Sequence, residues 1–200
     1  LTAIRAEREN DLGFLIGSSD PNDDLILAAG FIDDGWAMRH LSMSLTGSLP
    51  EPKVPEGIRI RPLAGVTEAG AYVTLHQSAF DSRNMSVEWR MRTLAHPAYQ
   101  PALDFVAEDE DGKLLAFCIG WTDSVQGIRT GQIEPLGVLP EAQKRGIGRA
   151  ILLTALRQMR TLGCEIAEID AESTNSASNH LYESAGFAER WHTHQFFRLF

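Results

Sequence analysis

A glycine-rich turn that opens an amphipathic helix constrains the fold of this 200-residue chain more than any other feature. The turn reads Gln143-x-x-Gly146-x-Gly148. The apolar residues after it recur three or four positions apart, which predicts a helix with one buried face; they are Ile151, Leu152, Ala155, Leu156, Met159 and Leu162. The free N–H groups of a helix start lie at the positive end of the helix dipole, and glycine has no Cβ to hold an anion away. The turn therefore suits a phosphate or a pyrophosphate.

The spacing of the turn excludes two common phosphate-binding loops. A P-loop would need Gly-Lys-Ser/Thr four residues after a first glycine, and the chain has no such run. The dinucleotide fingerprint would need a third glycine where Ile151 stands. A nucleotide-binding protein of either type is therefore disfavoured. The alternative, that the glycines serve only close packing at a helix start, stays open at this point.

Composition excludes several function classes. The formal net charge of −9 argues against nonspecific binding to nucleic acid or to an anionic membrane. No apolar run approaches the ~18 residues of a membrane span. Cys118 and Cys164 lack the spacing of metal ligands, and two buried thiols in a reducing compartment are favoured over a disulfide. We therefore expect a cytoplasmic protein that has no bound metal and no nucleic-acid or membrane partner.

The first fifty residues differ from the rest of the chain in charge. They hold eight acidic and three basic residues, so more than half of the net negative charge falls in a quarter of the sequence. Pro50, Pro52 and Pro55 then indicate a stiff linker. The sequence predicts an acidic N-terminal segment at 1–55 and a second domain at 56–200.

Residues 57–200 have the pattern of a complete α+β unit. A strand is expected at 58–63, helices at 69–80 and 87–94, and a hairpin of 103–107 with 114–120 that turns at Asp111-Gly112. A strand at 131–138, the central helix, a strand at 166–170, a helix at 176–184 and a strand pair at 187–200 follow. Local hairpins with one crossover predict an α+β sheet and not a dinucleotide-binding array.

A second motif accompanies the glycine turn, and the two together are more specific than either alone. It reads Asn175-x-x-Ser178-x-x-x-Tyr182-x-x-x-Gly186-Phe187. The pair resembles the GNAT superfamily of N-acetyltransferases, whose signatures are Gln/Arg-x-x-Gly-x-Gly/Ala and Asn-x-x-Ala-x-x-x-Tyr-x-x-x-Gly-Phe; Ser178 stands where alanine is usual. The resemblance covers about residues 57–200. It implies the GNAT fold, a mixed α/β arrangement of a mostly antiparallel twisted sheet with flanking helices. In that fold the strands at 131–138 and 166–170 splay apart, and Pro135 and Gly137 suit such a break.

The resemblance implies acetyl-CoA as cosubstrate and assigns residues to it. The backbone of 136–138 would line the pantetheine arm, 143–150 would hold the pyrophosphate, and Asn175 and Tyr182 would contact the cofactor. The full set is Leu136, Gly137, Val138, Gln143, Lys144, Arg145, Gly146, Ile147, Gly148, Arg149, Ala150, Asn175 and Tyr182. The side chains of Lys144 and Arg145 could instead point to solvent, and Asn175 could be an ordinary helix N-cap.

Tyr182 and Glu134 are the catalytic candidates. Direct acetyl transfer releases a thiolate, which Tyr182, the general acid implied by the resemblance, can protonate. An ammonium is not nucleophilic, so a base must take its proton, and Glu134 is our candidate, with His76 and His180 as alternatives. Strict alternation puts Gln132, Glu134 and Leu136 on one strand face, near the cofactor. Four further residues are expected to shape an acceptor pocket: Asp81, Trp89, Trp121 and Asp123.

The N-terminal segment contains an echo of the C-terminus. Ala28-Ala29-Gly30-Phe31 and Trp36 parallel Ser184-Ala185-Gly186-Phe187 and Trp191. In GNAT proteins this unit closes the last helix and begins the final hairpin, so the chain resembles the C-terminal repeat of a tandem GNAT protein. Chance similarity of two helix–glycine–strand units is the alternative.

The sequence therefore predicts an acetyl-CoA-dependent N-acetyltransferase that acts on a primary amine of a small molecule. The acidic segment at 1–55 could pack on its own domain or on a partner chain, and the second arrangement would give a homodimer. The rival interpretation is a non-catalytic acyl-CoA-binding module, because the glycine turn recognises CoA whether or not chemistry follows.

Overall fold

The computed structural model describes residues 4–8 and 11–199 and divides the chain into two compact units. Unit 1 combines the N-terminal residues up to Ser42 with the residues from Asp170 onward, and unit 2 comprises Met43–Ile169. The unit boundaries fall within β3 and β8, whereas the predicted domain boundary near residue 55 is untested and stays a prediction.

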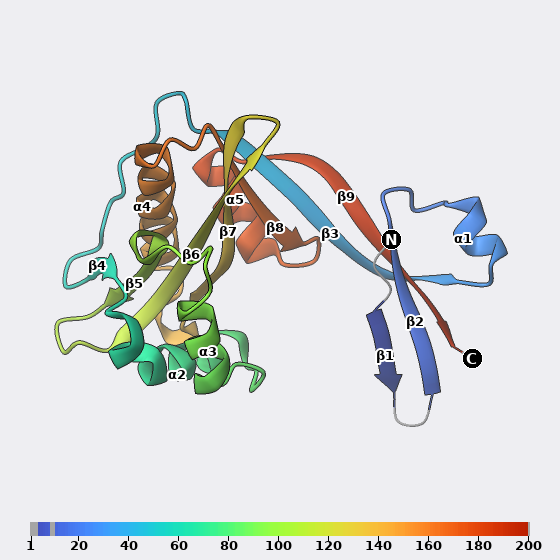
Figure 1. Ribbon diagram of the computed structural model, residues 1–200, viewed down its shortest axis with the longest axis horizontal. Coiled ribbons are helices and arrows are strands. Elements are labelled where there is room, and N and C mark those ends of the chain that lie inside the picture. The colour runs from blue at the N-terminus through green and yellow to red at the C-terminus, as the bar shows by residue number, and fades with distance from the viewer. Residues whose placement is uncertain (1–3, 9–10, 200) are drawn as a thin grey trace. The chain divides into compact units, whose positions relative to one another are not determined.

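Unit 2 contains the elements expected from the first strand of the α+β unit to the strand after the central helix (Figure 1). The expected helix at 176–184 and the last strand belong to unit 1. Its helices are α2 (Ala69–Phe80), α3 (Val87–Leu94) and α4 (Ile147–Thr161), with short 3-10 turns η1 (Gly65–Glu68), η2 (Pro101–Leu103) and η3 (Pro140–Ala142). Its strands are β4 (Arg59–Pro62), β5 (Asp104–Glu108), β6 (Leu114–Val125), β7 (Ile128–Val138) and the first part of β8 (Ile166–Glu172). The mixed arrangement of helices and strands that the sequence predicts for this part of the chain is confirmed.

The strands of unit 2 lie in the order β8-β7-β6-β5-β4, with helices on both faces of the sheet. All neighbouring pairs are antiparallel except β7 with β8, which is parallel. A Cβ on Gly131 would lie 2.6 Å from the Sδ atom of Met159, so α4 packs closely on one face. A Cβ on Gly137 would meet Phe117 at 2.5 Å and Ala79 of α2 at 3.3 Å, so α2 packs on the other. Eight side chains of α4 are buried against this core.

A β-bulge interrupts β7 at the position where the sequence predicts a break. Gly120 of β6 pairs with Ile133, but the next recorded pair is Cys118 with Leu136, so Glu134 and Pro135 together face a single residue of β6. The parallel register of β7 with β8 also ends there, at Ile133 opposite Ile169. The expected break between these strands therefore falls at Glu134-Pro135.

The bulge corrects the expectation of strict alternation. Leu136 is paired with Cys118, which places it on the sheet face of Ile133 and Gly120. Glu134 keeps the opposite face, together with Gln132. Because the extra residue of the bulge reverses the alternation, Leu136 does not share a face with Glu134.

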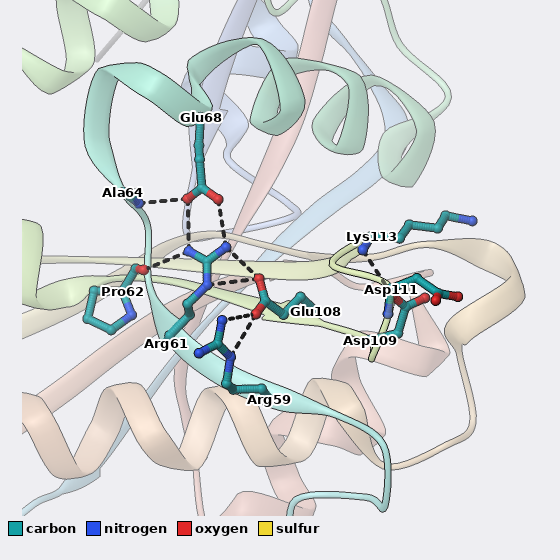
Figure 2. Close-up of polar contacts among 9 residues, drawn as sticks. All are labelled: Arg59, Arg61, Pro62, Ala64, Glu68, Glu108, Asp109, Asp111 and Lys113. Atoms are coloured by element: carbon teal, nitrogen blue, oxygen red, sulfur yellow. Dashed lines mark hydrogen bonds and ion pairs between the residues drawn. The ribbon is translucent and has the colours of Figure 1, made fainter.

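Arg61 binds two carboxylates at the β4–β5 edge, and Arg59 binds one of them (Figure 2). Arg61 donates to Glu108 at 2.8 Å and to Glu68 at 2.8 and 2.6 Å, and Arg59 donates to Glu108 at 2.7 Å. The Glu68 carboxylate also accepts the backbone N–H of Ala64 at 2.7 Å. These contacts, with Arg61 the largest cause, lower the pKa of both glutamates, while Glu68 and Glu108 raise the pKa of Arg61. The network ties β4, β5 and η1 together.

Unit 1 contains the strands β1 (Ile4–Arg8), β2 (Asp11–Ser18), β3 (Ile32–Ser44) and β9 (Ala188–Leu199), with helices α1 (Asp24–Ala28) and α5 (Ser176–Ala185). β9 pairs antiparallel with β2 on one side and with β3 on the other. The expected strand pair at 187–200 is therefore wrong, because β9 is one continuous strand. Its partners come from the N-terminal residues, not from a local turn.

Candidate active site

The start of α4 is built as an open anion site in unit 2. Gly146 is the N-cap residue, with φ +83°, and no side chain caps the helix among the residues that the structure describes. Lys144 has φ +59°, so the chain turns sharply just before the helix. Gln143, Lys144, Arg145 and Gly146 are exposed, while Ile147 and Ala150 anchor the first turn in the core. The N–H groups of this first turn are therefore held rigidly and face an accessible surface.

β7 leads directly to this helix start. Gly137 is buried, and its lack of a side chain leaves room for the Phe117 ring. The Gln143 side chain donates to the carbonyl of Val138 at 3.3 Å, which connects the turn back to the strand. The structure thus brings together, in one unit, the predicted residues from Leu136 to Ala150.

Glu134 lies at the bulge, with an exposed carboxylate. Trp121 donates its indole N–H to the Glu134 carbonyl at 2.8 Å, and the Gln132 amide donates to the Glu134 carboxylate at 3.3 Å. The two side chains that donate these hydrogen bonds lie on the face of β6 and β7 that packs against α2. The bulge therefore presents a carboxylate whose backbone is fixed by a neighbouring strand.

A cavity of about 670 Å³ opens beside Glu134. It is lined by Trp89, Arg92, Thr93, His96, Trp121, Gln132 and Glu134. Of the four residues expected to shape an acceptor pocket, Trp89 and Trp121 line this cavity and Asp81 and Asp123 do not; Asp81 instead ends α2 with φ 46°. The expectation missed Arg92, Thr93 and His96, although two of them follow Trp89 at helical spacing.

Asn175 and Tyr182 belong to α5, in unit 1. Asn175 is the N-cap and accepts the N–H of Ser178 at 3.1 Å, so the capping interpretation of its side-chain oxygen is correct. Tyr182 is buried, with its ring 6.2 Å from that of Phe187. His180 is exposed on the same helix. Tyr182 therefore lies in unit 1 and Glu134 in unit 2.

Arg39 of β3 fixes α5 within unit 1. It donates to Asn179 and Glu183 of the helix at 2.7 Å each and to Glu189 of β9 at 2.6 Å. The two carboxylates, Glu183 first, raise the pKa of Arg39. The helix that carries Tyr182 is thus tied to two strands by one guanidinium.

His76 lies in an aromatic cluster under β6. Its ring stacks on Phe117, with centroids 5.4 Å apart, and meets Phe80 edge-on at 4.8 Å. Burial is the main cause of its lowered pKa, and the charge of Arg90 adds to it. These surroundings favour the neutral imidazole of His76. The Phe117 ring that it stacks on is the one that an added Cβ at Gly137 would meet.

The geometry of a helix start beside a broken strand agrees with the comparison to known families. The sequence profile of the acetyltransferase (GNAT) family matches residues 71–187, more than half of the chain. The chain belongs to the acetyltransferase (GNAT) family. Members of this family use acetyl-CoA as cosubstrate, and the matched range includes both the glycine turn and the Asn175–Phe187 segment.

Curated relatives of the chain include two mycothiol acetyltransferases. That of Streptomyces coelicolor is 32% identical over 155 residues, which cover 75% of this chain and 49% of the relative. That of Thermobispora bispora is 33% identical over 175 residues, which cover 82% of this chain and 58% of the relative. The chain thus spans about half the length of these curated relatives.

Solved structures share the fold at low sequence identity. A GCN5-related N-acetyltransferase from Sphaerobacter thermophilus matches with a TM-score of 0.80 and 20% identity over 96% of this chain and 61% of that chain. A tandem GNAT protein from the clavulanic acid biosynthesis pathway matches with a TM-score of 0.70 and 14% identity over 94% of this chain and 64% of that chain. These likenesses support the GNAT fold.

The described residues contain neither a membrane-spanning helix nor a cluster of metal ligands. No helix in residues 4–8 and 11–199 has the length and apolar character needed to cross a bilayer. Within the same ranges, no group of three or more potential metal ligands is found. Cys118 and Cys164 are buried free thiols, as expected, and burial raises the pKa of both.

Proposed function

We propose that this chain is an acetyl-CoA-dependent N-acetyltransferase domain that transfers the acetyl group directly to a primary amine. The observation that carries the proposal is the uncapped start of α4, with Gly146 at φ +83°, joined to a strand that is bulged at Glu134-Pro135. A helix start with free N–H groups attracts a pyrophosphate. A strand that leaves its parallel neighbour exposes backbone groups to a pantetheine arm. The residues therefore fit acetyl-CoA.

The fit extends to the polar side chains of the turn. Lys144 and Arg145 are exposed next to the helix start, where they can add charge to a pyrophosphate site. The capping role of Asn175 uses its side-chain oxygen and leaves the amide N–H groups as donors. We assign 143–150 to the pyrophosphate and 136–138 to the pantetheine arm. Contacts of Asn175 with the cofactor arm and of Tyr182 with the cofactor sulfur stay predictions from the sequence resemblance.

Acetyl-CoA supplies an acetyl thioester, and the chain supplies the groups that move protons. Glu134 accepts a proton from the acceptor ammonium, directly or through water, so that the nitrogen can form the new C–N bond as the C–S bond breaks. Tyr182 donates its phenolic proton to the departing sulfur. The carboxylate fixed by Gln132 and the bulge supports the first role.

The cavity beside Glu134 is our candidate for the acceptor site. Its two tryptophan side chains give an apolar wall, and Glu134 gives a negative charge that attracts an ammonium. Amino sugars, aminoglycosides, amino acids, thiol-precursor sugars and protein N-termini are all suitable in chemistry. Because two relatives are named for mycothiol, mycothiol-type amines belong in the first acceptor panel.

Thiol release in the presence of acetyl-CoA and this amine panel tests the proposal. We expect wild-type turnover, with kcat lower by about a hundredfold or more in Glu134→Gln and in Tyr182→Phe, since each removes a proton-transfer group. Glu110→Gln, an exposed carboxylate in the 109–113 turn, is the control and should keep wild-type rates. His76→Gln tests the alternative base. Unchanged turnover in both Glu134→Gln and Tyr182→Phe would contradict the proposed roles.

The competing function is a non-catalytic acyl-CoA-binding module. The free N–H groups of α4 favour it equally, because binding needs only the helix start. Acetyl-CoA binding without turnover on any amine of the panel would select this function.

We also propose that residues 1–55 derive from a preceding GNAT-like repeat. Within unit 1, α1 and its C-cap Ala29 are followed by Gly30, with φ +80°, and then by β3. α5 has Gly186 as its C-cap, with φ +109°, and leads into β9. β3 and β9 then pair antiparallel around Ala37 and His194. The same helix–glycine–strand unit thus occurs twice, in opposite directions. A cytoplasmic location and a homodimer stay predictions from the sequence.

A further inference from the structure

Helix α3 forms one wall of the cavity beside Glu134. Trp89, Arg92 and Thr93 of α3 and the following His96 supply four of the seven lining residues, and the others come from β6 and β7. The distance between α3 and these strands therefore sets the width of the cavity. The contacts that hold α3 in place therefore decide which acceptor molecules the cavity can admit.

Of the four apolar side chains of α3, Leu94 is half-buried and the other three are largely exposed. Val87, Trp89 and Met91 are 49%, 55% and 41% exposed. The one fully buried side chain of the helix is charged: it is Arg90. A helix that packs by the hydrophobic effect has the opposite pattern.

Arg90 connects α3 to three other parts of unit 2. Its guanidinium forms an ion pair with Asp104, the first residue of β5, and both side chains are buried. Its Cζ atom lies 3.7 Å from the ring centroid of Tyr72 in α2, a cation–π contact. Tyr99, in the loop after α3, donates its hydroxyl to the same Asp104 oxygen at 2.6 Å. One arginine thus joins α3 to α2, to β5 and to its own following loop.

The ion pair of Arg90 with Asp104 is poorly suited to stabilising the fold by itself. Among the described residues, the Nε and Nη1 atoms of Arg90 and the Oδ1 atom of Asp104 have no hydrogen-bond partner although they are buried. Burial raises the pKa of Asp104, despite the opposing charge of Arg90. A buried, partly satisfied ion pair adds little stability over apolar residues of similar shape, but it fixes a defined geometry.

We propose that Arg90, with Asp104 and Tyr99, is a positioning residue that sets the acceptor wall formed by α3. This role rests on the proposed function, because the cavity is assigned to the acceptor amine. Arg90 acts through Trp89, Arg92, Thr93 and His96 and does not itself line the cavity.

Three variants separate positioning from stability. Arg90→Met and Asp104→Asn each leave one buried charge without its partner, so both should lower the melting temperature and raise the acceptor KM by about tenfold or more. The double variant Arg90→Met/Asp104→Asn removes both charges. It should recover most of the thermal stability and keep the raised acceptor KM, with the acetyl-CoA Kd unchanged throughout. Tyr99→Phe, which keeps the ion pair, should raise the acceptor KM less and serves if the single variants do not fold.

The matched control is Arg61→Met, which breaks an arginine contact with the buried carboxylate of Glu108 at the β4–β5 edge (Figure 2). It should lower stability and leave the acceptor KM unchanged. Amide hydrogen exchange supplies a readout that does not depend on turnover: the amides of 87–94 should exchange faster in the double variant than in wild type, and not in Arg61→Met.

The outcomes distinguish the two proposals. A raised acceptor KM in the double variant, with faster exchange confined to α3, supports positioning. A double variant with wild-type acceptor KM and wild-type exchange overturns it, as does a KM that merely follows the melting temperature in all variants. If wild type transfers no acetyl group, the proposed function fails, and exchange in α3 alone then decides whether Arg90 positions the helix.

Discussion

The ion pairs of Arg61 with Glu68 and Glu108 make part of the folding stability dependent on pH. Arg61 lowers the pKa of Glu68 and of Glu108 in the folded protein. The unfolded chain therefore binds more protons than the folded chain as pH falls below the ordinary glutamate pKa of about 4.3. The stability from these contacts is present above that pH and is lost as pH falls through the lowered pKa values.

We expect Arg61→Met to reduce this acid sensitivity. Its free energy of unfolding should fall below that of wild type at pH 7, and the difference should shrink as pH falls below about 4, because protonated glutamates no longer benefit from the arginine. Urea unfolding at pH 7 and at pH 3 measures both differences. A deficit that stays constant over this range would show that the network acts through packing and not through charge.

A substitution of Gly146 tests, also at the scale of one residue, whether the start of α4 binds acetyl-CoA. A Cβ at φ +83° is strained, so Gly146→Ala should cost about 1 kcal/mol of stability. It should also weaken acetyl-CoA binding, because a Cβ stands where the pyrophosphate approaches the backbone.

Gly112→Ala is the matched control, because Gly112 has φ +79° and open space around it, like Gly146. It should show the same loss in urea unfolding and an unchanged acetyl-CoA Kd by titration. Equal Kd values for the two alanine variants would mean that the space at Gly146 plays no part in binding.

At the scale of elements, β7 carries the parts of the site that belong to unit 2. Glu134 lines the cavity at the bulge, and the residues after the bulge lead to the start of α4. Two glycines let helices and aromatic rings approach this strand on its two faces. Gly131 faces the flexible end of Met159, whereas Gly137 faces the stiff ring of Phe117.

Replacing these two glycines should have unequal effects. In Gly137→Ala the new Cβ would lie 2.5 and 2.6 Å from two Phe117 ring atoms, so overpacking should cost about 1–3 kcal/mol and displace the strand that lines the pantetheine arm. Gly131→Ala should be cheaper, since Met159 can change rotamer. Urea unfolding and acetyl-CoA titration compare them, and equal losses in both would contradict this account of β7.

The elements that the sequence predicts well are those with strong local signals. α2 and α3 have the expected bounds because apolar periodicity and the Ser86 cap are local. The hairpin turn at Gln126-Gly127, with φ of 52° and 84°, went unpredicted because glutamine is not a usual residue for positive φ. β9 was expected to be two strands because its partners, β2 and β3, lie more than 140 residues away in the chain.

The site residues also differ in this respect: some have a local sequence signal that predicts them, and others have none. The turn at Gln143–Gly148 follows from spacing along one segment. Strict alternation put Glu134 on the same face as Gln132, which holds, and on that of Leu136, which the bulge prevents. Arg90 gave no such signal, because an arginine in a short helix reads as a solvent-facing residue. Its partner Asp104 lies beyond a loop, so the buried pair becomes visible only when α3 packs on β5.

At the scale of the whole molecule, the N-terminal residues complete the sheet of unit 1. β2 and β3 occupy both edges of β9, with pairs from Gly13–Leu199 to Ser42–Ala188. Without them β9 would present two rows of unpaired backbone groups. The N-terminal segment is therefore part of the fold around the last strand.

Deleting residues 1–55 should lower the melting temperature and cause aggregation, because both partners of β9 are lost. Deleting residues 1–10 removes β1 and leaves β2, so it should be tolerated much better. Thermal melts and size-exclusion chromatography measure both effects. An unchanged melting temperature and elution volume for the larger deletion would contradict the role of the segment.

The central claim, that the start of α4 binds acetyl-CoA, is tested most directly by calorimetric titration of acetyl-CoA and CoA into wild type, Gly148→Glu and Gly70→Glu. Gly148 and Gly70 are each the second residue of a helix, so the two variants add the same charge at matched positions. We predict micromolar binding to wild type and Gly70→Glu, and none to Gly148→Glu, because a carboxylate there repels the pyrophosphate. Absence of binding to wild type, or equal binding to all three proteins, would contradict the claim.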